Sequence, residues 1–287
     1  MMDQIISFIT EHKIPVGLWG ATIVEWLTDN LETTFDAITA AIRWPLEGSV
    51  ELMLLIPVPI FIALVMGAAW LLQRNWKIHL LVGLGLLFIL NQGLWVPMIE
   101  TLVLVICATF VSLMIGIPTG IICAKRPNLY KAITPVLDMM QTIPTFVYLV
   151  PTLILFGLGL VPGLIATVIY AVPASIRLTY LGISGVPVAL VEAGESFGCT
   201  RRQLLFRVKL PAALPSIMAG INQTIMLSLS MVVIAALVGA GGLGALVVRA
   251  LGNVDAERGL EAGIVIVVVA IILDRMLSSQ QRQKEKR

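Results

Sequence analysis

The sequence predicts an all-α polytopic membrane protein with about seven transmembrane helices. Of the 287 residues, 58% are hydrophobic and only 13% are charged, and the mean hydropathy is +0.97. Apolar stretches near or above 18 residues, the length that an α-helix needs to cross a bilayer, recur along the chain. Basic residues gather on one side when these stretches are threaded alternately through a membrane. Together these features exclude a single soluble core.

Residues 1–49 are expected to form an N-terminal amphipathic segment on the outer side. Between Val24 and Arg43, apolar residues recur at steps of three or four, which places on one face of a helix Leu27, Leu31, Phe35, Ile38 and Ile42. The acidic residues of this stretch lie off that face, so the helix is a poor match to one that binds anionic lipid. We therefore expect it to lie in the outer interface or to pack against the membrane spans.

Seven predicted spans follow this segment. Their expected bounds are 50–72, 78–95, 98–124, 143–161, 163–184, 212–239 and 260–277. We interpret residues 50–96 as accessory transmembrane helices and residues 97–277 as the core of the fold. The third span is expected to break near Gly116-Ile117-Pro118. Residues 278–287 form a basic tail.

The basic residues predict the orientation of the chain. With the N-terminus outside and seven crossings, the outer side receives only Lys13, Arg43, Arg249 and Arg258. The other 15 of the 19 Lys and Arg residues, Arg177 among them, are then assigned to the inner side. The positive-inside rule prefers this arrangement, which makes the C-terminal tail cytoplasmic.

A polar stretch interrupts the apolar pattern between the fifth and sixth spans. It runs from Glu192 to Pro211 and reads EAGESFGCTRRQLLFRVKLP. Thr200 and Gln203 have the spacing of a capping box at a helix N-terminus, and Pro211 is expected to mark a bend into the next span. The basic residues of the stretch either meet an acidic partner or form an ordinary cytoplasmic loop that obeys the positive-inside rule.

The spacing of this stretch resembles the EAA loop of bacterial ABC importer permeases. Glu192-Ala193-Gly194 is followed after three residues by Gly198, and after nine more by Val208 and Leu210-Pro211. Gly194 replaces the second Ala of that pattern and Val208 replaces its Ile. In that family the loop forms two short helices that dock on the ATPase. The resemblance implies that segment 188–211 docks through Glu192, Ala193, Gly194, Gly198, Arg201, Arg202, Leu210 and Pro211.

A longer resemblance covers about residues 97–276. The runs DMMQTIPTFVYLVPTLILFGLGLVPGLIAT, YAVPASIRLTYLGISGVP, MAGINQTIMLSLSMVVIAALVGAGGLG and EAGIVIVVVAIILDR look like the ProW-type permeases of glycine betaine, proline betaine and choline importers. The resemblance implies a type I (MetI-like) fold in the bacterial inner membrane. It further implies a second copy of this chain, a separate cytoplasmic ATPase that binds ATP and Mg²⁺, and a separate external binding protein.

Several signals of other functions are missing from the sequence. No Walker A pattern, metal-ligand spacing or disulfide framework occurs, so we expect no catalytic site and no cofactor bound by this chain. We expect lipid rather than nucleic acid around it. The alternative is a self-contained secondary carrier or channel, which would need ion-coupling or filter residues that the spans lack. A membrane scaffold or sensor is the third possibility.

A transport path for a quaternary ammonium compound would need aromatic faces, because such a cation cannot donate a hydrogen bond. Tyr148 and Tyr170 are the candidates for this role, and Asn222 and Met231 are further candidates in the sixth span. For the tyrosines the alternative is packing between helices. For Asn222 it is an interhelical hydrogen bond, and for Met231 it is gap filling.

Overall fold

The structure, a computed structural model, describes residues 15–284, so residues 1–14 and 285–287 lie outside it. Every regular element in the described range is a helix, which confirms the predicted all-α class. The elements are α2 (Val16–Leu55), α3 (Val58–Gln73), α4 (Trp76–Asn91), α5 (Trp95–Lys125), α6 (Pro127–Thr142), α7 (Thr145–Phe156), α8 (Leu160–Ser184), α9 (Val188–Ser196), α10 (Arg201–Gln203), the π-helix η1 (Leu204–Lys209), α11 (Leu210–Ala235), the 3₁₀ turn η2 (Ala236–Val238), α12 (Gly242–Asn253) and α13 (Ala256–Lys284).

The number of spans differs from the prediction. Within residues 15–284, three helical stretches are long and apolar enough to cross a membrane, or up to five if each of two bent pairs counts as one span. The predicted span 50–72 crosses the first of these bends, of 103°, and the predicted span 143–161 begins at the second, of 94°. The residues at the bends, Ile56 and Ile143, each precede a proline and are extended, because the proline ring disfavours the helical conformation of the residue before it.

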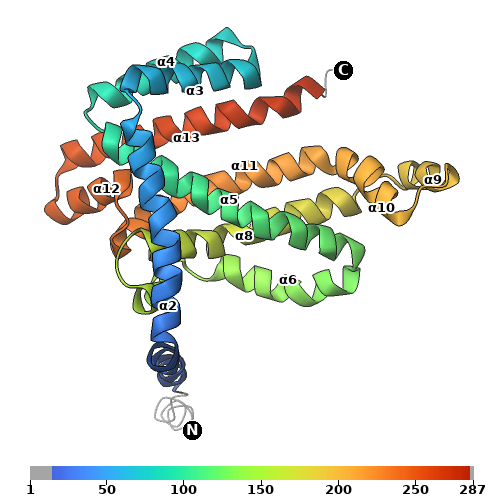
Figure 1. The fold of residues 1–287 in the computed structure, drawn as a ribbon, viewed down its shortest axis with the longest axis horizontal. Helices are drawn as coiled ribbons and strands as arrows, with labels where there is room; N and C mark the ends of the chain where they lie inside the picture. The colour runs from blue at the N-terminus through green and yellow to red at the C-terminus, as the bar shows by residue number, and fades with distance from the viewer. Residues whose placement is uncertain (1–14, 285–287) are drawn as a thin grey trace, which may run out of the picture.

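Helix α2 runs across the bundle formed by the other long helices (Figure 1). It is kinked at Leu31, continues past residue 49 and ends only at Leu55, so the amphipathic segment runs without a break into the start of the first predicted span. The predicted apolar face is partly buried, and the Phe35 ring packs edge-on against Phe156 of α7 at 5.3 Å between centroids. The 103° bend that follows turns the chain into α3.

The centre of the bundle is formed by α5, α8 and α11, which lie side by side in Figure 1. Small residues allow α5 and α8 to approach closely. A Cβ atom on Gly116 would lie 1.7 Å from Ser175 Oγ, and one on Gly120 would lie 2.6 Å from Thr179 Cβ. Helix α5 continues through Pro118, so the break predicted at Gly116-Ile117-Pro118 is absent.

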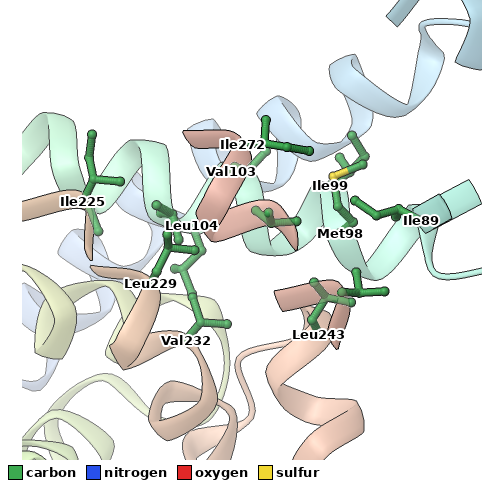
Figure 2. Packing of buried hydrophobic residues seen from close by; sticks show 14 of the residues in the cluster. Ile89, Met98, Ile99, Val103, Leu104, Ile225, Leu229, Val232, Leu243 and Ile272 are labelled. Carbon is green, nitrogen blue, oxygen red and sulfur yellow. The ribbon is translucent and has the colours of Figure 1, made fainter. Parts of the chain in front are cut away.

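The largest apolar cluster joins the accessory helices to this centre (Figure 2). Ile89 of α4 and Ile272 of α13 pack with Ile99 of α5 in the same buried cluster. Residues Leu229 and Val232 of α11 extend it. Burial of side chains of this size stabilises a fold by about 1.5–3 kcal/mol each in water, whereas in lipid close packing replaces most of that term.

A glycine-rich turn connects α11 to α12. Gly239 ends the short 3₁₀ turn in the left-handed conformation, and α12 begins at Gly242. The first N–H groups of α12 point at α5: Gly242 N donates to the Glu100 carboxylate at 2.5 Å, and Leu243 N donates to Thr101 Oγ1 at 2.9 Å. These bonds satisfy two of the donors that a helix N-terminus leaves without partners.

Candidate coupling segment and transport path

Segment 188–211 projects from one end of the bundle as two short helical pieces, at the end opposite α12 (Figure 1). Helix α9 starts directly after Pro187, whose fixed φ suits a helix start. The second piece starts after Thr200, and the predicted capping box is present. Gln203 N donates to Thr200 Oγ1 at 3.3 Å, and Thr200 N donates to Gln203 Oε1 at 2.8 Å.

Gly198 makes the turn between the two pieces. Its φ is +72°, a region in which residues other than glycine are strained. Cys199 N donates to Gly194 O at 3.1 Å and Gly198 N donates to Glu195 O at 2.9 Å, which is the bonding pattern of a Schellman motif. Nothing lies within 4 Å of a Cβ built on Gly198, so backbone conformation rather than crowding requires glycine here.

Gly194 is required for a different reason. It is buried where α9 packs on η1, and a Cβ atom there would lie 2.7 Å from Leu204 Cδ1 and 3.4 Å from Val208 Cγ2. The EAA pattern has alanine at this position. Glycine is present here where the methyl group of an alanine would be too close to Leu204 in the second piece. Leu204 and Leu205 are buried, as expected of the apolar face of this piece.

The predicted bend at Pro211 is wrong. The chain from Arg201 to Val238 is one continuous helical stretch, in which η1 links the second piece to α11. Leu210 and Pro211 are the first residues of α11, and Leu210 N donates to Leu205 O in the wider π geometry. A π turn takes up the missing N–H and the steric clash of a proline without breaking the helix. The second piece of segment 188–211 is thus continuous with the longest apolar helical stretch.

The surface of the segment carries most of the predicted docking residues. Glu192, Ala193 and Gly198 are exposed, as are Arg201 and Arg202. Phe197, which precedes the turn glycine, is not among the predicted docking residues, yet its side chain is 89% exposed. A single aromatic residue in a polar loop carries no periodic signal, so only its exposure in the fold identifies it.

Three of the four path candidates lie in one apolar cluster. Tyr148, Tyr170 and Met231 pack around Leu149, and Met231 is fully buried within this chain. The Tyr148 hydroxyl donates to Met140 O at 2.7 Å, which ties α7 to the end of α6. Asn222 lies outside this cluster, and its buried Oδ1 accepts no hydrogen bond from the described residues.

A charged contact joins α6 to α8. Arg177 Nη2 lies 2.5 Å from Asp138 Oδ1. The count of basic residues assigns Arg177 to the inner side of the membrane, but it lies inside α8, seven residues before Ser184. Two aromatic rings from the same two helices, Tyr130 and Tyr180, stack with centroids 3.5 Å apart and planes at 10°. No sequence pattern predicts either pairing, because the partners are distant along the chain.

Residues 116–285 match the family described as the binding-protein-dependent transport system inner membrane component. Since this match covers more than half of the chain, the chain belongs to that family. It is therefore a non-catalytic permease subunit of a multi-pass inner membrane transport system. This class differs from the self-contained carrier or channel that was the alternative.

The relatives of this chain are more specific. It is 42% identical, over 96% of its own length and 78% of the relative's, to the glycine betaine/proline betaine transport system permease protein ProW of Escherichia coli. It is 44% identical to the glycine betaine permease OpuAB of Bacillus subtilis, over 96% and 97% of the two chains. It is 46% identical to the glycine betaine/carnitine permease GbuB of Listeria monocytogenes, over 92% and 94%.

The fold has relatives among solved structures. The inward-facing MetNI methionine ABC transporter aligns with a TM-score of 0.59 at 24% identity, over 69% of this chain and 96% of that chain. At this identity the likeness concerns the fold alone, and it confirms the predicted MetI-like permease core.

Proposed function

We propose that this chain is the membrane permease of an importer for glycine betaine or a closely related quaternary ammonium compound such as choline. The observation that carries the substrate class is the identity of 42–46%, over at least nine-tenths of this chain, to three permeases named for glycine betaine. In this proposal a separate cytoplasmic ATPase binds ATP and Mg²⁺, and a separate external binding protein delivers the substrate. Two copies of the chain enclose the path.

The coupling segment 188–211 is proposed as the ATPase docking site. Support comes from its projection beyond the spans, its exposed arginines and the exposed Phe197 ring. An exposed aromatic beside a glycine turn is a natural anchor for a pocket in a partner, because aromatic side chains contribute a large share of binding energy at interfaces. The continuous helix from Arg201 to Val238 gives a direct mechanical link from this segment to the span.

The mechanism in this proposal is alternating access driven from outside the chain. Closure of the ATPase dimer on ATP moves the two coupling segments together, and the rigid stretch through η1 and α11 transmits that movement to the path. Coupling requires that the segment fits the ATPase differently in the two states, because an equilibrium shifts only through differential interaction. ATP hydrolysis then restores the inward-facing state.

The docking prediction is tested with Phe197→Ala. Loss of a buried aromatic contact lowers the affinity for the ATPase by about tenfold or more. The measurement is copurification of the ATPase from native membranes in mild detergent, together with uptake of labelled glycine betaine and choline. Leu251→Ala is the matched control, because Leu251 is 72% exposed on α12 at the opposite end of the bundle.

Gly198→Trp is the stronger variant, since it both strains the turn and adds bulk to the surface. We expect it to insert into the membrane normally and to lose the ATPase and uptake. Retention of the ATPase by both Phe197→Ala and Gly198→Trp would overturn the docking role. Copurification of an ATPase with the wild type but no uptake of either labelled compound would overturn the substrate class.

A further inference from the structure

The ion pair between Asp138 and Arg177 differs from the others in this chain. Within the described residues, the remaining ion pairs join residues one to four positions apart on the same stretch of chain. Asp138 and Arg177 are 39 positions apart and come from two different helices, α6 and α8. The contact therefore depends on how these helices pack, which they do through an apolar cluster around Leu137, Val172 and Ile176.

Arg177 lies inside a helix long and apolar enough to cross a membrane, and Asp138 lies in a helix packed beside it. Arg177 is seven residues from the end of α8, which corresponds to about 10 Å of helix. Asp138 is eleven residues into α6, or about 16 Å from its start, in the first helix of a bent pair that forms either one broken span or a re-entrant loop. Ionisable side chains at such depth face the bundle interior or a water-filled cavity, because contact with lipid is costly.

The exposed fractions of the two side chains show whether this chain alone encloses the pair. The Asp138 side chain is 54% exposed and that of Arg177 is 28% exposed, so the packing of this chain alone does not enclose them. Leu137, one position before Asp138, is buried against α8, which fixes the rotation of α6. The carboxylate is therefore exposed on the surface of this chain beside α8, where contact with lipid would be costly.

We infer that Asp138 and Arg177 line the transport path and bind the two ends of a zwitterionic substrate. The inference rests on the proposed function, since it takes a betaine as the compound carried. A betaine has one carboxylate and one quaternary ammonium group. Arg177 offers charge-assisted hydrogen bonds to the carboxylate, and Asp138 offers an opposite charge to the ammonium.

The remaining groups at the pair fit this chemistry. Only Nη2 of Arg177 donates to Asp138, and a guanidinium has five N–H donors, so others are left for a substrate carboxylate. Arg177 Nε is buried and donates to no acceptor in the described residues. Tyr180, which stacks on Tyr130, lies three residues after Arg177 and so on the same side of α8. Aromatic rings and a carboxylate are the groups that attract a quaternary ammonium. In the absence of substrate the two charges neutralise each other.

Accessibility to water tests the location of the pair without any measurement of activity. In the complete transporter, with Cys107, Cys123 and Cys199 replaced by Ala, Gln141→Cys is treated with a trimethylammonium-bearing methanethiosulfonate; Gln141 is exposed and lies three residues after Asp138, on the same side of α6, so the pair itself stays intact. We expect rapid modification, because a thiol at a wetted position ionises, and about tenfold slower modification in saturating glycine betaine. Val136→Cys is the matched control: Val136 is 56% exposed on the same helix but about 200° around it from Asp138, and we expect no protection there.

A second experiment separates binding from a structural ion pair. The double variant Asp138→Asn/Arg177→Gln removes both charges without leaving one of them unpaired. We expect normal ATPase copurification, normal thermal stability and about tenfold slower glycine betaine uptake. Uptake at the wild-type rate by the double variant, or failure of glycine betaine to protect the thiol of the Gln141→Cys variant, would overturn the inference. Wild-type transporter that takes up no glycine betaine would instead overturn the proposed function.

Discussion

Near the start of α5, Thr101 holds the first turn of α12 in place. Its hydroxyl accepts the N–H of Leu243, and the side chain is 1% exposed. Glu100, one position earlier, accepts the N–H of Gly242. A negative or acceptor group is favourable at a helix N-terminus, where backbone N–H groups have no partners within the helix. Two adjacent side chains of one helix thus cap another that is 142 positions away in the sequence.

Thr101→Val tests this cap with an isosteric change. The substitution leaves the buried N–H of Leu243 without an acceptor, which costs about 1–3 kcal/mol. We expect a lower thermal unfolding temperature for the purified protein in detergent. Thr167→Val is the control: Thr167 is equally buried, but its hydroxyl donates to Gly163 O in its own helix, a carbonyl that keeps its backbone bond. An equal decrease in unfolding temperature for Thr101→Val and Thr167→Val would contradict the capping role of Thr101.

At the scale of elements, α5 and α8 cross at a short distance because α5 has glycines, which have no side chain, at the crossing. Gly116 and Gly120 lie one turn apart on α5 and face Ser175 and Thr179 on α8. Ser175 Oγ donates to Ser112 O across this crossing at 3.3 Å. Small residues and interhelical hydrogen bonds stabilise helix pairs in a membrane, where lipid offers no hydrophobic driving force for association.

Gly116→Ala is expected to push these two helices apart. The added Cβ would meet Ser175 Oγ at 1.7 Å and Ser175 Cβ at 2.7 Å, and overpacking of this kind costs about 1–3 kcal/mol. Thermal unfolding in detergent measures the loss, and the double variant Gly116→Ala/Ser175→Gly should recover part of it. Gly263→Ala in α13 meets nothing within 4 Å and serves as the control. If Gly116→Ala and Gly263→Ala were equally stable, the prediction that α5 and α8 have no room for a side chain at Gly116 would be wrong.

At the scale of the whole molecule, the two ends of the bundle differ in character. One end carries the coupling segment with its exposed arginines, and the other carries α12 and the long helix α2 (Figure 1). The positive-inside rule assigns the first end to the cytoplasm. The bent pairs α2–α3 and α6–α7 turn by 103° and 94°, so parts of the chain lie across the direction of the spans.

Cysteine labelling from the two sides tests this orientation. In a background without native cysteines, Leu251→Cys on α12 should react with a membrane-impermeant thiol reagent added outside spheroplasts. Phe197→Cys in the coupling segment should react only after the membrane is opened. Both residues are strongly exposed, at 72% and 89%, so access to the reagent differs only by side. Labelling of the Phe197→Cys variant in sealed spheroplasts would reverse the proposed topology.

The sequence by itself determined the features that depend on neighbouring residues. Apolar length and composition set the membrane class, and the spacing around Thr200 predicted the capping box, since a cap and its helix are local. The EAA-like spacing placed a glycine at Gly198, where the structure has a tight turn, because such a turn is formed by residues close together in the sequence. The predicted apolar face of α2 is partly buried except at Ile38, which is exposed, and the helix continues beyond its expected end.

The tertiary structure alone decided what depends on residues far apart in the chain. The Asp138–Arg177 pair, the exposure of Phe197 and the cap on α12 all follow from how helices pack. The uninterrupted helix through Pro118 and the π turn before Pro211 have the same origin, because close neighbours and a local change in winding can accommodate a proline that a sequence pattern treats as a break. Periodicity describes one helix at a time, whereas the path and the coupling surface arise between helices.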